Sequence, residues 1–404
     1  MGLPTGAVSE KLIRPLMPEL DSLRGVAILL VLFFHGFNVA GLAWSRWPVA
    51  GRAFFTVILG GWTGVYLFFV LSGFLITGIL LDSKPKPRYY RRFYIRRALR
   101  ILPAFYLLLL LLIVLPRTGW LEHRKVDWPF IGLSFLYLAN VTNLFGVPAQ
   151  YAALWSLAVE EHFYFVWPMI VRRLSRRAVA WCALGIFAVS PAVRAAAYWL
   201  GGNPGAGYTW LVADGLAIGA FMAALSRGRL AERVAMRNFS FICLAVAIGL
   251  FAAGTPFGIW QGVRFFGAVF RDTAVDIFYA GFLGLTLVLG TGRLKWIVRR
   301  PILQWFGEIS YGLYLVHMLA YDFVDHLIVR YFPGLYVQIS SRFGLMVLRF
   351  IMGTGIAVAA AFLSRKYFEE RFLRLKDRWT PAQSRLAPNA AAIVEACGVG
   401  QKTA

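Results

Sequence analysis

The sequence predicts an all-α membrane protein, a polytopic bundle of about ten transmembrane helices with both termini in the cytoplasm. Hydrophobic residues make up 59% of the 404 residues and charged residues only 15%, whereas a soluble domain carries nearer a quarter charged. The apolar residues form long blocks such as 65–81 and 107–115, and each helix that crosses a bilayer needs about 20 mostly apolar residues. The basic residues, in addition, gather on alternate connections.

Ten apolar segments can be interpreted as spans. They are 23–43, 57–81, 98–115, 154–171, 178–199, 208–225, 239–254, 273–290, 303–329 and 343–363. The stretch 130–145 is too short and interrupted, so we expect a re-entrant or surface helix between the third and fourth spans. Residues 1–18 are predicted to be a cytoplasmic segment, 19–375 the membrane domain, and 376–404 a disordered cytoplasmic tail.

The distribution of charge supports this orientation. If the N-terminus is cytoplasmic, the inner segments hold 31 of the 42 Lys and Arg residues, as the positive-inside rule requires. The net charge of +23 therefore indicates topology and attraction to anionic lipid in the plasma (inner) membrane, and not a nucleic-acid partner. The three cysteines, Cys182, Cys243 and Cys397, have no metal-like spacing, so we expect no metal site and no disulfide.

His35 lies within the first predicted span. An ionisable group there costs about 2.5–3.5 kcal/mol on insertion scales, which makes it a functional candidate. His35 follows Arg24 by 11 residues, or about 16 Å of helix, so it lies near the middle of the membrane while Arg24 lies at the inner surface. A neutral imidazole can accept a proton, although a packing histidine would fit equally well.

The fourth span begins with Trp155 and carries two adjacent acids, Glu160 and Glu161, followed by His162. Glu160 lies about 8 Å below the outer end of the span. This depth is compatible with a role in orienting His35, and a carboxylate facing a loop is the alternative. We expect at most one of the two adjacent acids to point inward.

Other polar residues within spans are candidates for substrate binding. Asp214 could pair with Arg194 or Arg349, or these residues could line an outward cavity for a polar substrate. Tyr314 and His317 share a helix face by their i, i+3 spacing, either as substrate contacts or as structural hydrogen-bonding groups.

Arg97 and Arg100 lie one turn apart at the inner end of the third span. Arginine binds phosphate bidentately, although snorkelling to lipid headgroups is the alternative. A basic inner site, a deep histidine and outer polar groups together fit transfer of a group from a phosphorylated cytosolic donor to an external acceptor.

Taken in order, these segments resemble the membrane acyltransferase-3 family. The resemblance rests on Arg24 and His35 at Arg-x10-His spacing, on Arg97-x-x-Arg100, and on the segment 155–164 with its Glu160. The segment 65–77, Asp214 with Gly219, and the segment 310–317 complete it over about residues 18–375. No single motif is decisive, but these motifs in this order are specific.

The resemblance implies transfer of an acyl group, most often acetyl, from acyl-CoA to a hydroxyl of a carbohydrate or glycolipid. By position, His35 is the catalytic histidine, Glu160 an essential carboxylate, and Arg24, Arg97 and Arg100 donor-side residues. Some relatives carry an extra esterase-like domain outside the membrane. We expect no such domain here and expect transfer to be completed within the bundle.

We favour direct transfer with His35 as general base over an acyl-enzyme on Ser72 or Ser156. A transporter or flippase for a glycolipid or polysaccharide is the alternative function, but the sequence lacks the clear internal repeats of many transporters. The sequence does not fix the acceptor, which could be lipopolysaccharide, exopolysaccharide, peptidoglycan, a glycolipid or a secreted small molecule. It also leaves acyl length and oligomeric state open.

Overall fold

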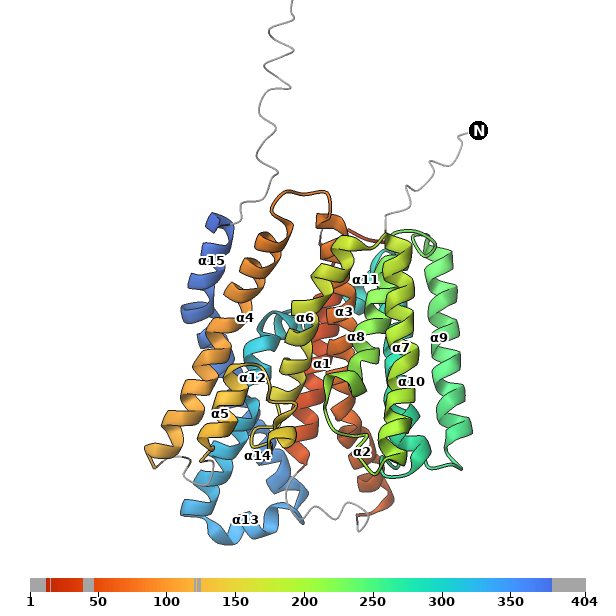
Figure 1. Ribbon diagram of the computed structural model, residues 1–404. Coiled ribbons are helices and arrows are strands. Elements are labelled where there is room, and N and C mark those ends of the chain that lie inside the picture. Colours follow the sequence, from red (N-terminus) through yellow and green to blue (C-terminus); the bar gives the residue numbers. More distant parts are fainter. Residues whose placement is uncertain (1–11, 15, 39–46, 120, 122–124, 380–404) are drawn as a thin grey trace, which may run out of the picture.

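The computed structural model describes residues 12–14, 16–38, 47–119, 121 and 125–379, and across these residues the regular structure is helical (Figure 1). Ten long helices form the bundle: α1 (Pro18–Phe37), α3 (Gly64–Ser83), α4 (Tyr89–Val114), α6 (Leu154–Arg173), α7 (Arg176–Trp199), α8 (Thr209–Leu225), α9 (Arg233–Gly254), α10 (Phe265–Gly290), α12 (Pro301–Tyr331) and α14 (Phe343–Leu363). The shorter elements are α2 (Val49–Leu59), η2 (Gly60–Thr63), η3 (Leu115–Arg117), α5 (Trp128–Phe135), η5 (Thr142–Phe145), α11 (Lys295–Val298), α13 (Pro333–Ile339), the π-helix η6 (Ser364–Glu369) and α15 (Glu370–Trp379).

Every predicted span corresponds to one of these long helices. In the described part of the chain, eight helical stretches are long and apolar enough to cross a membrane. The other two predicted spans correspond to α8, which is shorter and apolar, and to α6, which carries Glu160 and Glu161. The predicted all-α polytopic membrane bundle is therefore confirmed.

Some predictions lie partly or wholly outside the described residues. The predicted first span ends at residue 43, beyond the last described residue of α1. Most of the predicted N-terminal segment and the tail from residue 380 onward also lie outside. The stretch 130–145, in contrast, is described, and it contains the short helices α5 and η5.

The connections alternate between the two ends of the bundle. The α3–α4, α6–α7 and α8–α9 connections lie at the same end as α15, whereas α5, α13 and the α9–α10 connection lie at the opposite end (Figure 1). The first group carries the basic segments that the sequence analysis assigned to the cytoplasm. That assignment remains a prediction. We call the end that carries the α3–α4, α6–α7 and α8–α9 connections the basic end.

Helix α4 begins earlier than its predicted span. The prediction began at residue 98, where the apolar run starts, but the helix begins at Tyr89. Arginine is a good helix former, so the basic stretch before the span continues the helix toward the basic end. As a result, its arginines project from one rigid element.

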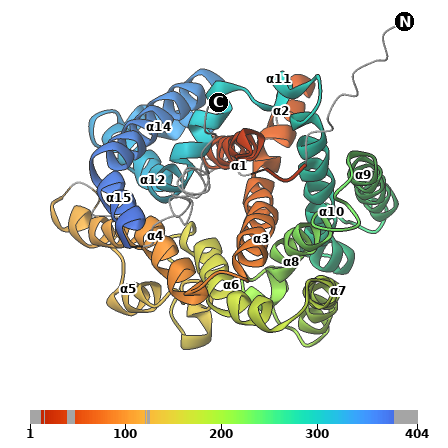
Figure 2. The same cartoon turned by 90° about the horizontal axis from the view of Figure 1, so that it is seen from above.

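The interior of the bundle contains α1 and α3, and α4, α7, α9 and α14 lie around them (Figure 2). Helix α1 packs closely on α12 through two glycines. A Cβ on Gly25 would lie 2.0 Å from the Leu303 carbonyl oxygen, and one on Gly307 would lie 2.0 Å from the Asp21 carbonyl oxygen. Only glycine permits this approach, which fixes α1 and its polar residues against α12.

Candidate active site

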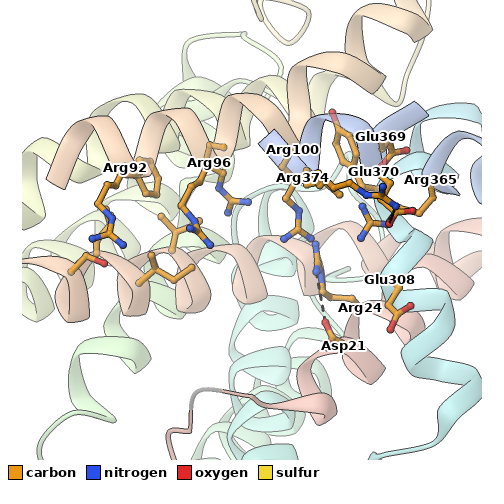
Figure 3. A pocket seen from close by; sticks show the side chains of 18 of the residues that line it. Asp21, Arg24, Arg92, Arg96, Arg100, Glu308, Arg365, Glu369, Glu370 and Arg374 are labelled. Carbon is orange, nitrogen blue, oxygen red and sulfur yellow. Dashed lines mark hydrogen bonds and ion pairs between the residues drawn. The ribbon is translucent and has the colours of Figure 1, made fainter. Parts of the chain in front are cut away.

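A cavity of about 930 Å³ opens among α1, α3, α4, α12 and the η6–α15 segment. Arg92, Arg96 and Arg100 follow one another along α4 at four-residue spacing and project toward the same side (Figure 3). This spacing places side chains on one helix face. The cavity is lined by nine basic residues, namely Arg24, Lys86, Arg92, Arg96, Arg97, Arg100, Arg365, Lys366 and Arg374.

Four acidic residues line the same cavity, so its basic side chains are partly compensated. Asp21 lies 3.8 Å from Arg24, and Glu370 lies 3.0 Å from Arg374. The nine basic residues still outnumber the acids by five. A cavity of this size and charge can hold a ligand that carries several phosphate groups.

The three arginines predicted on the donor side, Arg24, Arg97 and Arg100, all line this cavity. The contributions of α4 upstream of Arg97 and of the C-terminal segment were not predicted. The four-residue repeat of Arg92, Arg96 and Arg100 was a readable signal. The C-terminal arginines, in contrast, gave no local sign that α15 packs near α4.

An inner cavity of about 300 Å³ continues from the basic one into the bundle. The two cavities share Arg24, Arg97 and Arg100 among their lining residues. Beyond these arginines, the inner cavity is lined by polar groups, among them Ser72, Ser156, Glu160, Tyr164 and Tyr314. A path thus leads from the basic end toward the middle of the bundle.

Glu160 belongs to the wall of the inner cavity. Its Oε1 accepts a hydrogen bond from the Ser72 hydroxyl at 2.9 Å, and its Oε2 accepts one from the Tyr164 hydroxyl at 3.0 Å. The Arg97 guanidinium lies 4.3 Å from the centre of the Tyr164 ring, a cation–π contact. Glu160 is therefore held by groups on the donor side.

Two expectations for the acidic pair need correction. The hydrogen bonds of Glu160 do not include the expected one to His35, because α6 turns this carboxylate toward Ser72 and Tyr164. Glu161 also lines the inner cavity, although only one acid was expected to point inward. Successive residues on a helix differ by about 100°, and the cavity is wide enough to receive both side chains.

His35 lies against a second histidine instead. Its ring centroid is 4.9 Å from that of His317, with the rings at 65°. Nδ1 of His35 lies 3.1 Å from the Val31 carbonyl oxygen, and Nδ1 of His317 lies 2.7 Å from the Tyr314 carbonyl oxygen. A carbonyl oxygen only accepts, so each Nδ1 donates, and a neutral ring then presents an unprotonated Nε2.

His317 is completely buried, and its Nε2 has no hydrogen-bond partner within the described residues. A buried polar atom without a partner is costly, and such atoms in native proteins are often explained by a catalytic role or an unobserved ligand. His317, which shares a helix face with Tyr314 as predicted, thus places a second imidazole next to His35.

Tyr314 lies between the inner cavity and the two histidines. Its hydroxyl is 2.6 Å from the Ser156 hydroxyl, and its ring centroid is 5.6 Å from that of His317. Tyr314 lines the inner cavity, whereas His35 and His317 line neither cavity. The path from the basic end thus reaches Tyr314, which contacts His317 of the histidine pair.

The remaining predicted substrate residues form buried ion pairs. Arg194 Nη2 lies 2.7 Å from Asp214 Oδ2, and both side chains are fully buried. Arg349 pairs instead with Asp325 of α12, a residue the sequence analysis did not single out. Of the two interpretations left open for Asp214, the structure shows pairing with Arg194, and substrate binding by these residues remains a prediction.

Potential metal ligands do not cluster in the described part of the chain. Among its residues, no group of three or more His, Cys, Asp or Glu side chains is placed to hold a metal ion. The side chains along the path from the basic end offer imidazole, hydroxyl, carboxylate and guanidinium groups. Such groups can transfer protons and bind anions.

Similarity to known proteins extends over most of the chain. The family described as "Acyltransferase domain" matches residues 17–366. YrhL of Bacillus subtilis (strain 168), whose name provisionally assigns it peptidoglycan O-acetylation, is 31% identical over 335 residues, covering 74% of this chain and 48% of its own. The peptidoglycan O-acetyltransferase OatA of Listeria monocytogenes is 32% identical over 166 residues, covering 38% of this chain and 24% of its own.

The chain thus spans about half or less of the length of these curated relatives. No solved structure shows significant similarity to it.

Proposed function

This chain belongs to the acyltransferase-3 family, and from its site we propose that it is a membrane O-acetyltransferase. It would move an acetyl group from cytosolic acetyl-CoA to a hydroxyl of a carbohydrate outside the plasma membrane. One observation carries the proposal: a basic cavity continues into an inner cavity that ends at Tyr314, next to the His35–His317 pair.

The donor half of the proposal rests on charge. The phosphates of acetyl-CoA bind the arginines of the basic cavity, above all Arg24, Arg97 and Arg100, through bidentate charge-assisted hydrogen bonds. The pantetheine arm extends through the inner cavity along Ser72 and Tyr164. Glu160 holds these two hydroxyls in place. The thioester then approaches the histidines at Tyr314 and Ser156.

The chemical step is direct transfer with His35 as general base. The acceptor hydroxyl oxygen attacks the thioester carbon while Nε2 of His35 removes its proton. The new C–O bond forms as the C–S bond breaks. The proton then passes from the imidazole to the departing thiolate, which leaves as the thiol of CoA. General base catalysis of this kind contributes about 10²–10⁴-fold in rate.

The acceptor is proposed from the relatives' names. Two of them refer to peptidoglycan, whose sugar hydroxyls face the outer side of the membrane. Peptidoglycan is therefore the first acceptor to test, followed by exopolysaccharide and lipopolysaccharide. Mass spectrometry of the surface glycans from a deletion strain should reveal a lost acetyl ester, with a mass lower by one acetyl group.

The proposal is tested most directly by replacing His35 with Ala. Purified protein in liposomes is given acetyl-CoA radiolabelled in the acetyl group, together with peptidoglycan fragments on the opposite side. We expect wild type to label the fragments and His35→Ala to lower the rate by about 10²-fold or more. His162→Ala is the matched control, because His162 bonds Thr209 and lines neither cavity.

Two results would contradict the proposal. Full acetyl transfer by His35→Ala would remove its proposed base. Movement of a glycan across the membrane without acetylation would instead favour the transporter alternative.

A further inference from the structure

The end of α1 that follows His35 is held by an ion pair that the proposed reaction does not use. Arg349 of α14 binds Asp325 of α12 bidentately, with Nε–Oδ1 at 2.6 Å and Nη2–Oδ2 at 2.7 Å. The remaining nitrogen, Nη1, donates to the carbonyl oxygen of Gly36 at 2.7 Å. All three guanidinium nitrogens are thus bonded, and the three helices α1, α12 and α14 meet at this group.

The position of the third bond matters because Gly36 directly follows His35. The last four carbonyl groups of a helix lack partners within the helix, and α1 ends at Phe37. Arg349 supplies a donor to one of them. A cation at this end is also favoured by the helix dipole. The backbone that carries the imidazole is therefore fixed from outside α1.

Helix α12 presents a matching face to α1. His317, Tyr321 and Asp325 follow one another at four-residue spacing, which aligns them on one face. His317 lies against the His35 ring, and the Tyr321 hydroxyl donates to the Leu32 carbonyl oxygen at 3.1 Å. Asp325 binds Arg349 of α14, which bonds Gly36. Helix α12 therefore contacts α1 directly before and at the position of the imidazole, and through Arg349 after it.

We propose that the Arg349–Asp325 pair is the positioning device of the acyl transfer reaction. It holds the end of α1 so that Nε2 of His35 lies within reach of the acceptor hydroxyl. This inference rests on the proposed function. Neither residue lines the two cavities described above, so both act through His35 and neither is a catalytic residue.

The effect should appear in turnover and not in donor binding. A misplacement of about 1 Å at a reacting group can cost about 10²-fold in rate. Donor binding depends on the arginines of the basic cavity, which the pair does not contact. Loss of the pair should therefore lower kcat, whereas KM for acetyl-CoA should change little.

Arg349→Lys is the informative variant. Lysine keeps the charge but lacks the planar fork, so it cannot reproduce the three bonds that Arg349 makes from three separate nitrogens. The Arg227–Asp82 pair is a closely matched control. It has Nε–Oδ1 at 2.7 Å and Nη2–Oδ2 at 2.6 Å, and its Nη1 donates to a backbone carbonyl, that of Ala223, at 3.0 Å. It joins the end of α8 to α3, and among the described residues it makes no hydrogen bond to α1.

Kinetics in liposomes give the first readout. We expect Arg349→Lys to lower kcat by about 10²-fold with KM for acetyl-CoA unchanged, and Arg227→Lys to behave like wild type. Asp325→Asn should lower kcat as well. When Arg349→Lys and Asp325→Asn are combined, kcat should fall by less than the product of the two single decreases, because the residues act as one unit.

A second readout reports the position of α1 without any need for activity. In a chain whose native cysteines are replaced by serine, His35→Cys and His317→Cys are joined with a short bifunctional thiol reagent. Adding Arg349→Lys should abolish most of this cross-link, whereas adding Arg227→Lys should leave it intact.

The two readouts separate the inference from the proposed function. If wild type transfers acetyl but Arg349→Lys matches Arg227→Lys in kcat, or if it raises only KM, the inference is overturned. An unchanged cross-link would also overturn it. If wild type transfers no acetyl while the cross-link depends on Arg349, the proposed function fails and the positioning of His35 by the pair is supported.

Discussion

At the scale of single side chains, the two neighbouring histidines make the same kind of backbone contact. Each Nδ1 donates to the carbonyl oxygen of a residue three or four positions earlier in its own helix. This fixes the tautomer of each neutral ring and leaves Nε2 as the basic atom. This geometry agrees with the proposed role of His35 as general base, which needs an unprotonated Nε2.

The arginines of the basic cavity allow a prediction about donor binding. Replacing Arg97 or Arg100 with Ala should raise KM for acetyl-CoA by about tenfold or more, because a hydrogen bond to a charged group contributes about 1.5–3 kcal/mol. Initial rates in liposomes at several acetyl-CoA concentrations measure this. Arg293→Ala is the control, since Arg293 is a basic residue that lines neither cavity.

A shortened donor sharpens this prediction. Acetyl-pantetheine without its phosphate lacks the groups that the arginines are proposed to bind. With this donor, wild type, Arg97→Ala and Arg100→Ala should have similar KM values. If Arg97→Ala and Arg100→Ala raised KM equally for both donors, these arginines would support the fold and would not bind phosphate.

Single residues also show how far the sequence could predict the site. Arg24, Arg97 and Arg100 meet as expected, because charge at the inner ends of spans is a local signal. The structure shows Glu160 bonded to Ser72 and Tyr164. The sequence left its partner open, because depth along a helix does not reveal which way a side chain turns. The partnership of Arg349 with Asp325 depends on the packing of α12 against α14, which no spacing in the sequence encodes.

At the scale of helices, close packing through glycine sets the positions of the polar residues. Helices α3 and α8 repeat the arrangement of α1 and α12. A Cβ on Gly73 would lie 2.0 Å from the Leu216 carbonyl oxygen, and one on Gly219 would lie 2.1 Å from that of Val70. These paired contacts bring backbones together, so helix register is fixed where the cavities lie.

This packing predicts a difference between glycines. Gly307→Leu should lower the thermal midpoint of unfolding in detergent, because overpacking costs about 1–3 kcal/mol and here the obstacle is backbone. Gly249→Leu in α9 should leave the midpoint nearly unchanged, since nothing lies within 4 Å of its Cβ position. Circular dichroism or a thermal-shift assay measures both. Equal midpoints would contradict the proposed role of the α1–α12 contact.

Helix existence was predictable from the sequence, but helix ends were less so. Long apolar runs located all ten long helices because burial in lipid requires them. Helix α4 continues past its apolar run because arginines sustain a helix, and η2 interrupts the second predicted span where Gly60 and Gly61 occur. Hydropathy carries no information on either feature.

At the scale of the whole molecule, one end of the bundle gathers the basic segments, the basic cavity and α15. The proposed reaction needs this end to face the cytosol, where acetyl-CoA is available, and the other end to face the acceptor. The positive-inside rule favours the same orientation. In this proposal the same basic residues set the orientation in the membrane and bind the donor.

This orientation predicts which thiols a membrane-impermeant maleimide can reach. In a chain whose native cysteines are replaced by serine, Asn203→Cys at the α7–α8 connection should be labelled in intact cells or spheroplasts. Lys295→Cys in α11 should be labelled only after the membrane is opened. Both side chains are exposed, so access depends on the side of the membrane and not on burial. The reverse pattern would place the basic cavity outside, away from cytosolic acetyl-CoA, and would contradict both the topology and the donor assignment.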